Sequence, residues 1–368
     1  MFFSPELVRH RKIVSRLSPN AAPAQIPFRD YESYRVYRPA ISFDAYPTLI
    51  YIPGNAFIAS EQDYTHFICT HIVAQSRCQV IMVKHPLAPE HPFPAGLEAA
   101  YKTTRLLLSD SVGIKMLKIN KSQIAIAGYS SGGNFAALIA IQAKIHKLPI
   151  ARQILISPVT DLSRSFNGFE EFQDKDRNIS EQFVAWFSSL YAPKPTWRFP
   201  LVSPRWASDV DLQSLPPTDL IFGELDRFRG DSEVYGQRLI GLGNRVNTVM
   251  FKNETHGLLW HNMAVVQTIS GRLSVAFGTE PVQRSLSIKM TKEDKQENIK
   301  GEKVGIQSVI ENAVTKPAVS VFFLKPNFKG RAPFRDIMLE AVAMSPAFNE
   351  RGARKLGYTC ESNAPKGS

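Results

Sequence analysis

The chain has 368 residues and a formal net charge of +11, which first suggests a partner of opposite charge such as nucleic acid or a membrane surface. The excess is uneven, because residues 281–368 carry 15 Lys and Arg against 9 Asp and Glu, or +6 of the +11. The first 280 residues are therefore close to an ordinary globular protein with one large domain. No motif in the chain uses basic residues for phosphate contacts, so we predict no nucleic-acid partner.

Cysteine content and hydropathy bear on the cellular compartment of the protein. Cys69, Cys78 and Cys360 are too few and too scattered for a disulfide framework or a zinc site, which favours a reducing compartment. Glu6 and Arg9 interrupt any signal-peptide stretch, and no run approaches the roughly 18 apolar residues of a membrane span. We predict no integral membrane segment and a cytoplasmic location by default, with export through a terminal signal as the alternative.

Short apolar segments alternate with helical segments along the first 280 residues. After a short helix at 4–18, strands are predicted at 34–37, 48–52, 79–84, 123–127, 153–156, 218–222 and 247–251. Helices are predicted at 96–108, 132–147 and 231–241. Such alternation is typical of βαβ units, so the expected fold class is α/β, with a mostly parallel sheet and helices on both faces.

A long insertion, residues 164–213, interrupts this alternation and is rich in aromatic side chains. A helix is predicted to start at Asn178, after which Phe183, Phe187 and Tyr191 share one face. An insertion of this length is typical of a lid or another functional segment.

The last 88 residues differ from the rest of the chain. Residues 281–316 are polar and of mixed charge, which predicts a flexible linker, and residues 317–368 form a basic appendage. The appendage is a candidate for binding a protein partner or a membrane surface, or for export; the alternative is a solvated extension without a specific role.

The strongest local signal is the segment GYSSGG, residues 128–133, between a predicted strand and a predicted helix. This is the context of a nucleophile elbow, in which glycines two positions before and after the nucleophile leave room for a tight turn. The segment predicts Ser130 as a nucleophile at the carboxyl end of the sheet, while a simple Gly/Ser turn is the alternative.

A serine nucleophile needs a base and an orienting acid. Asp226 and His256 each follow a predicted strand, in the order Ser, Asp, His that this kind of elbow requires. We therefore predict His256 as the base and Asp226 as the acid.

Three other residues compete for these two roles. Glu224 precedes the expected turn, Asp231 is predicted to cap a helix, and His261 lies within the next helix. His66 and His71 do not share a helix face, so no metal pair is predicted.

The chain resembles the hormone-sensitive-lipase-like branch of the α/β-hydrolases, which includes bacterial carboxylesterases and arylacetamide deacetylases. YIPGNAF (51–57) stands for the Y-x-H-G-G-G-F of that branch, HPLAPEHPFPA (85–95) for Y-R-L-A-P-E-H-P-F-P-A, and GYSSGGN (128–134) for G-D-S-A-G-G-N. The resemblance covers about residues 20–278. It implies an α/β-hydrolase fold with a small helical cap from about 1–25 and 164–213, in a catalytic domain of residues 1–280.

The resemblance also implies an oxyanion hole made of backbone donors. These would be the N–H of Ser131 and those of the loop containing Gly54, Asn55 and Ala56. Asn55 and Ala56 replace two glycines of the family, and Asn55 is also a candidate side-chain donor. Two further departures are Tyr129 in place of the Asp before the nucleophile, and His85-Pro86 in place of Tyr-Arg.

The function implied is a serine carboxylesterase that needs no metal or cofactor and cleaves small-molecule esters of short to medium acyl chain length. Candidate substrate-binding residues are Phe57, Tyr129, Phe183, Trp186 and Phe187. The alternative is a ligand-binding protein on the same fold, as in plant gibberellin receptors, which have lost the catalytic histidine. The presence of Ser130, Asp226 and His256 argues against that alternative.

Overall fold

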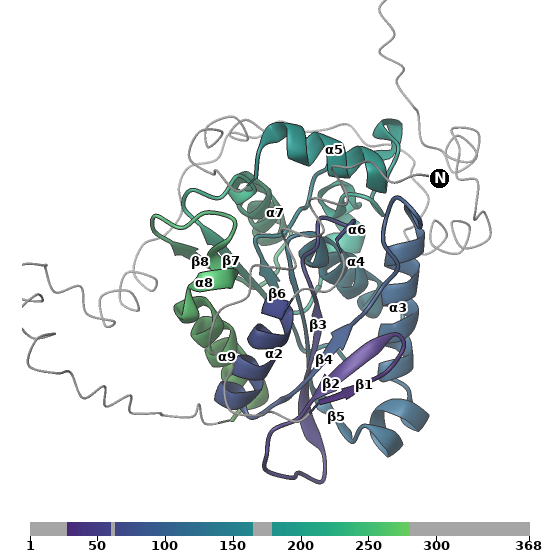
Figure 1. Ribbon diagram of the computed structural model, residues 1–368, viewed down its shortest axis with the longest axis vertical. Coiled ribbons are helices and arrows are strands. Elements are labelled where there is room, and N and C mark those ends of the chain that lie inside the picture. Colours follow the sequence, from purple (N-terminus) through teal and green to yellow (C-terminus); the bar gives the residue numbers. More distant parts are fainter. Residues whose placement is uncertain (1–27, 60–62, 165–178, 280–368) are drawn as a thin grey trace, which may run out of the picture. The chain divides into compact units, whose positions relative to one another are not determined.

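The computed structural model describes residues 28–59, 63–164 and 179–279. Within these residues one sheet has the strand order β1-β2-β4-β3-β5-β6-β7-β8 (Figure 1). The strands are β1 (Phe28–Asp30), β2 (Tyr34–Tyr37), β3 (Tyr46–Ile52), β4 (Gln79–Val83), β5 (Ile119–Tyr129), β6 (Arg152–Ile156), β7 (Thr218–Gly223) and β8 (Val246–Phe251). The β1–β2 and β2–β4 pairs are antiparallel, and the other neighbouring pairs are parallel. The predicted α/β class with a mostly parallel sheet is confirmed.

All seven predicted strands are present, and their ends differ from the prediction by at most a few residues. The largest difference is at β5, where the strand extends beyond the apolar run 123–127 in both directions. β1 was not predicted, because it is short and contains the charged Arg29 and Asp30.

Helices cover both faces of the sheet. The α-helices are α2 (Asp63–Ser76), α3 (Ala95–Leu107), α4 (Ser131–Ile145), α5 (Glu181–Tyr191), α6 (Asp209–Leu212), α7 (Arg229–Gly241), α8 (Leu258–His261) and α9 (Met263–Phe277). Shorter turns of π- and 3-10-helix are η1 (Asp110–Met116), η2 (Lys194–Thr196) and η3 (Pro204–Trp206). None of these helices is long and apolar enough to cross a membrane.

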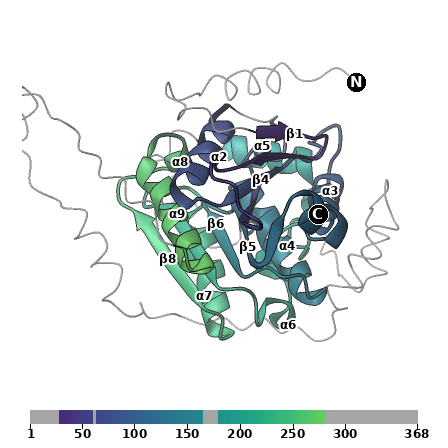
Figure 2. The same cartoon turned by 90° about the horizontal axis from the view of Figure 1, so that it is seen from below.

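The alternation of side chains along β3 shows how the two faces are built. Ile50 and Ile52 lie in one apolar core with residues of α3 and α4, while Leu49 and Tyr51 lie in a second core with residues of α2 and α9. Figure 2 shows α9 and α4 on opposite sides of β5 and β6. Because both faces are buried, β3 is apolar along nearly its whole length, as expected for a central parallel strand.

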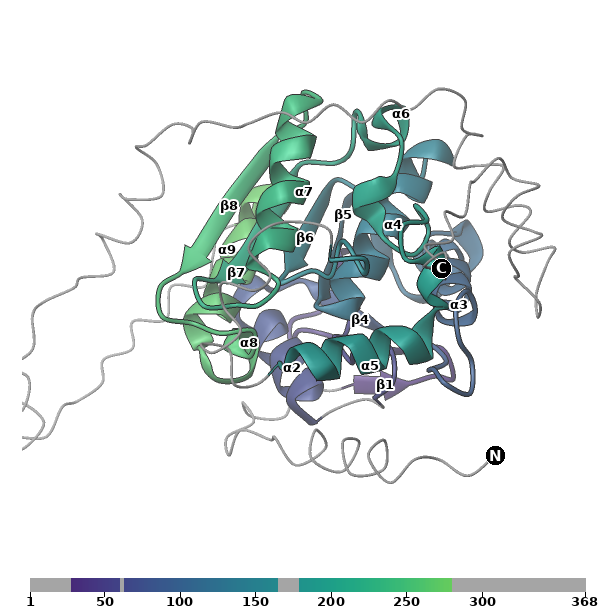
Figure 3. The same ribbon diagram turned by 90° about the horizontal axis from the view of Figure 1, so that it is seen from above.

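The described part of the insertion contains α5, η2, η3 and α6, and α5 lies across the end of the sheet where the site is found (Figures 1 and 3). α5 begins after Ser180, whose hydroxyl accepts the N–H of Phe183. The prediction of Asn178 as the start was therefore two residues early, and Asn178 itself lies outside the described residues. So do the predicted helix at 4–18, the cap segment 1–25, the linker 281–316 and the appendage 317–368.

Candidate active site

Ser130 lies in the tight turn between β5 and α4. Its φ of 55° and ψ of −120° place it in a conformation that is costly for a residue with a side chain. A Cβ added to Gly128 would lie 2.1 Å from the carbonyl oxygen of Gly132, and one added to Gly132 would lie 2.2 Å from that of Ile52. Both positions of the motif therefore require glycine, for the steric reason that the sequence suggested.

His256 lies in the loop after β8 and contacts both Ser130 and Asp226. Its Nε2 is 2.9 Å from Ser130 Oγ, and its Nδ1 is 3.0 Å from Asp226 Oδ1. Asp226 Oδ1 also accepts the N–H of Phe228 at 2.8 Å, and all three side chains are buried. Because an ionised carboxylate can only accept, Nδ1 carries the proton that faces Asp226, which leaves Nε2 as an acceptor for the Ser130 hydroxyl.

Two of the competing residues form other contacts. Glu224 Oε2 accepts the N–H of Asn253 at 3.0 Å, and His261 Nε2 lies 2.7 Å from Glu254 Oε2 on the surface. The structure therefore brings His256 and Asp226, and neither Glu224 nor His261, to Ser130.

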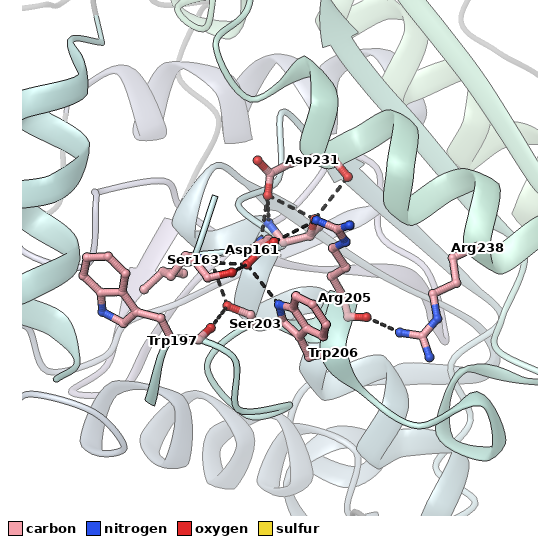
Figure 4. A network of polar contacts seen from close by, with 10 residues as sticks. Asp161, Ser163, Trp197, Ser203, Arg205, Trp206, Asp231 and Arg238 are labelled. Carbon is pink, nitrogen blue, oxygen red and sulfur yellow. Dashed lines mark hydrogen bonds and ion pairs between the residues drawn. The ribbon is translucent and has the colours of Figure 1, made fainter. Parts of the chain in front are cut away.

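Asp231, the third competitor, is held in a different network (Figure 4). Its Oδ1 accepts the N–H groups of Thr160 and Asp161 at 2.6 and 2.7 Å. Asp161 in turn accepts from Arg205 at 2.8 Å and from Trp206 at 3.0 Å. The prediction that Asp231 caps a helix was wrong: it lies in the first turn of α7, and its side chain holds the segment after β6. Burial, with the charge of Asp161 nearby, raises the pKa of Asp231 well above its ordinary value.

Two aromatic rings flank the imidazole of His256. The ring of Tyr129 is stacked beside it, with centroids 5.3 Å apart and 24° between the planes, and the Phe228 ring lies at 5.1 Å. The Tyr129 hydroxyl donates to the backbone carbonyl of His256 at 2.7 Å. Tyr129, predicted as a substrate-binding residue, is thus placed against the base and is almost completely buried.

The other predicted substrate-binding residues gather near the loop after β3 and on α5. The Phe57 ring stacks on Tyr191 with centroids 3.8 Å apart and contacts Phe187 at 6.2 Å. Phe183 contacts Phe187 at 5.3 Å and Trp186 at 6.0 Å. Phe57 and Phe187 are buried, while Phe183 and Trp186 are partly buried. Tyr191 was not among the predicted site residues, although its helical spacing had already put it on the face of Phe183 and Phe187.

The loop after β3 is fixed by hydrogen bonds between Asn55 and Ser131. The Asn55 N–H donates to Ser131 Oγ, and the Ser131 hydroxyl donates to Asn55 Oδ1, each at 3.0 Å. Asn55 Oδ1 also accepts the N–H of Phe57 at 3.0 Å. The left-handed backbone falls on Ala56 and Phe57, with φ of 51° and 62°, and not on Asn55.

Gly54 and the backbone donors complete this loop. A Cβ on Gly54 would lie 2.5 Å from Tyr129 Cδ1, and its carbonyl accepts the hydroxyl of Tyr64. In the described part of the chain, the N–H groups of Ala56 and Ser131 donate to no other protein group, whereas that of Asn55 does. Of the predicted oxyanion donors, the Asn55 N–H is therefore occupied, whereas those of Gly54, Ala56 and Ser131 have no acceptor among the described residues.

His85 extends the network around Asn55. Its Nδ1 lies 3.1 Å from the carbonyl of Pro86, and its Nε2 lies 3.4 Å from Asn55 Nδ2. Loss of solvent around the ring lowers the pKa of His85 to about 4. The ring is therefore neutral near pH 7, with the proton on Nδ1 and an acceptor facing Asn55.

Among the described residues, no group of three or more His, Cys, Asp and Glu side chains is placed to hold a metal ion.

Comparison with known proteins places this geometry in a family. Residues 49–260, well over half of the chain, match the alpha/beta hydrolase fold family. The chain is 28% identical to carboxylesterase NlhH of Mycobacterium tuberculosis over 271 residues, which cover 71% of this chain and 79% of that protein. It is 25% identical to the gibberellin receptor GID1A of Arabidopsis thaliana over 249 residues, which cover 61% and 70%.

A solved structure agrees with these relatives. The hyperthermophilic esterase from the archaeon Pyrobaculum calidifontis superimposes with a TM-score of 0.65 at 27% identity, over 74% of this chain and 92% of that one. The chain belongs to the alpha/beta hydrolase family, in its hormone-sensitive-lipase-like branch.

Proposed function

We propose that this protein is a serine carboxylesterase in which Ser130, His256 and Asp226 form the catalytic triad. The observation that carries the proposal is the unbroken series of contacts from Ser130 Oγ to His256 at 2.9 Å and from His256 to Asp226 at 3.0 Å. The names of the relatives, a carboxylesterase and an esterase, support the same activity.

In the proposed reaction Ser130 Oγ attacks the ester carbonyl carbon while His256 Nε2 takes its proton. Asp226 orients the imidazole and stabilises the cation that forms. The N–H groups of Ser131 and Ala56 stabilise the tetrahedral oxyanion, and its collapse expels the alcohol, which takes the proton from His256. Water, deprotonated by His256, then attacks the acyl-enzyme carbonyl; the bond to Ser130 Oγ breaks, Ser130 takes the proton back from His256, and the acid is released.

We propose short to medium acyl chains as the substrates. The buried rings of Phe57, Phe187 and Tyr191 already pack against one another, which supports a site without room for a long chain beside the oxyanion loop.

The direct test is Ser130→Ala, assayed with p-nitrophenyl acetate, butyrate and laurate. We expect hydrolysis of all three to fall to background, and wild-type activity to be lower on laurate than on butyrate. Undiminished hydrolysis by the variant would remove Ser130 from the mechanism, and a preference for laurate would contradict the proposed chain length.

The similarity to a gibberellin receptor supports one alternative, a ligand-binding protein on the same fold. A fluorophosphonate probe separates the two, because it labels only an activated serine. Labelling of the wild type and none of Ser130→Ala is expected for the esterase, whereas an unlabelled wild type would favour the receptor.

We also propose that residues 1–280 form the catalytic domain and that residues 281–368 are an appendage outside it. A chain ending at residue 280 should then keep the esterase activity of the whole protein. Loss of activity in a folded truncated protein would make the tail part of the catalytic domain.

A further inference from the structure

Two departures from the family pattern contact each other. Asn55 stands where the matched loop has glycine, and Ser131 stands where the matched elbow has alanine, 76 residues later. Their hydrogen bonds run in both directions, from the Asn55 N–H to Ser131 Oγ and from the Ser131 hydroxyl to Asn55 Oδ1. The side chain that each departure adds is thus a partner for the other.

The backbone that follows Asn55 needs such support. Ala56 and Phe57 both have a left-handed φ, which a residue with a Cβ adopts only when its surroundings hold it there. Asn55 Oδ1 accepts the N–H of Phe57, a local side-chain contact that stabilises a turn of this kind. The Phe57 ring is in turn fixed by its stacking on Tyr191.

The same contacts decide which amides face a substrate. The Asn55 N–H is occupied by Ser131 Oγ, while the N–H groups of Ala56 and Ser131 have no acceptor in the described residues. His85 Nε2, at 3.4 Å from Asn55 Nδ2, fixes which end of the Asn55 amide points toward the loop. Without that contact the amide could turn over and offer donors where acceptors are required.

We propose that Asn55, Ser131 and His85 form a positioning network that holds residues 55–57 in their left-handed turn, so that the N–H groups of Ala56 and Ser131, and not that of Asn55, receive the oxyanion. In this chain, side-chain hydrogen bonds hold the loop in the shape that the flexible glycines allow in the family. The inference rests on the proposed esterase function, whose own test is the Ser130→Ala variant.

The experiment compares Ser131→Ala, Asn55→Gly and the double variant with p-nitrophenyl butyrate. We expect each single change to lower kcat on the order of ten-fold, with KM nearly unchanged, because the donors move while the rest of the site stays. The double variant should lose no more than the worse single variant, since both changes break one shared contact. Ser131→Thr keeps the hydroxyl and should recover most of the activity.

A second measurement reports on the oxyanion itself. A trifluoromethyl ketone forms a tetrahedral adduct with the nucleophilic serine, so its inhibition constant should rise in each variant by about the factor by which kcat falls. Ser270→Ala is the matched control, because Ser270 is also buried, lies on α9 and donates to no group among the described residues. A cooperative thermal unfolding transition in each variant shows that the variant is folded. The two single variants test the Asn55–Ser131 contact from either side, so one remains informative if the other does not fold.

Three results would overturn the network. They are full kcat and full inhibitor affinity in Ser131→Ala, losses in the double variant equal to the product of the two single losses, and no recovery in Ser131→Thr. A wild type whose hydrolysis does not depend on Ser130 would instead refute the proposed function, so the two failures are distinguishable.

Discussion

The two sides of Ser130 are built in different ways. On the base side, His256 and Asp226 sit in loops that follow β8 and β7, and the parallel sheet brings these loops to Ser130 at the end of β5. On the oxyanion side, the loop after β3 takes its shape from side-chain hydrogen bonds of Asn55. Sheet topology therefore places the base and the acid, whereas individual side chains place the oxyanion donors.

The largest expected effect is on the base side. His256→Ala should lower kcat/KM on the order of 10⁴-fold or more, because the proton of Ser130 loses its acceptor. Steady-state kinetics with p-nitrophenyl butyrate measure this, and His261→Ala is the control, since that exposed side chain pairs with Glu254 instead. A greater loss in His261→Ala than in His256→Ala would reverse the assignment.

An intermediate effect is expected where Tyr129 supports the base. Tyr129→Leu removes the ring beside the imidazole and the hydroxyl that holds the His256 carbonyl, so kcat/KM should fall on the order of ten- to a hundred-fold. Tyr129→Phe keeps the ring and should cost only a few-fold. Equal losses in the two variants would mean that the ring contributes nothing and that the hydroxyl alone positions His256.

A smaller effect is expected on the oxyanion side at Ala56. Because its φ of 51° penalises a Cβ, Ala56→Gly should raise the free energy of unfolding by up to about 1 kcal/mol. Its kcat should stay within about two-fold, since the N–H and the hydrogen bonds of Asn55 remain. Urea unfolding and steady-state kinetics check both. A clear loss of stability would show that the strain attributed to this turn is absent.

The smallest effect concerns Asp231, which lies in the first turn of α7 and holds the segment after β6. Its raised pKa means that the folded protein holds a proton which the unfolded chain releases, so this group favours folding most below pH 4 and progressively less as the pH rises. Asp231→Asn cannot ionise and keeps an acceptor for Thr160 and Asp161, so at pH 7 its stability should stay within roughly 1 kcal/mol of wild type.

The pH dependence of that variant is the sharper measurement. Urea unfolding between pH 4 and pH 8 should show the stability of Asp231→Asn improving relative to wild type as the pH rises. A relative stability that stays constant or falls over this range would mean that Asp231 is ionised in the folded protein.

Much of the base side could be predicted from the sequence, because its signals are local. The sequence shows that Ser130, Asp226 and His256 each follow a predicted strand and that they occur in this order. The glycines at 128 and 132 mark the tight turn around Ser130. Parallel strands then bring their carboxyl ends to one edge without any further information.

The rest depends on contacts between distant residues. The Asn55–Ser131 pair spans 76 residues and the Tyr129–His256 pair spans 127, so neither has a local pattern. The Asp231 side chain likewise crosses to Thr160 instead of capping its own helix, because the buried N–H groups there need an acceptor. Such side-chain contacts follow from tertiary packing, which the hydrophobic periodicity of the sequence does not reveal.

The position of Ser130 directly after β5 bears on how the protein would lose activity. Among the described strands β5 is the longest, and it lies between β3 and β6. The Ser130 N–H donates to the carbonyl of Ile156 on β6. Backbone amides in such a strand exchange with solvent only when the whole sheet opens. On heating, hydrolysis and the protection of the β5 amides from hydrogen exchange should therefore be lost at the same midpoint temperature. Loss of esterase activity would then report the global unfolding of the domain.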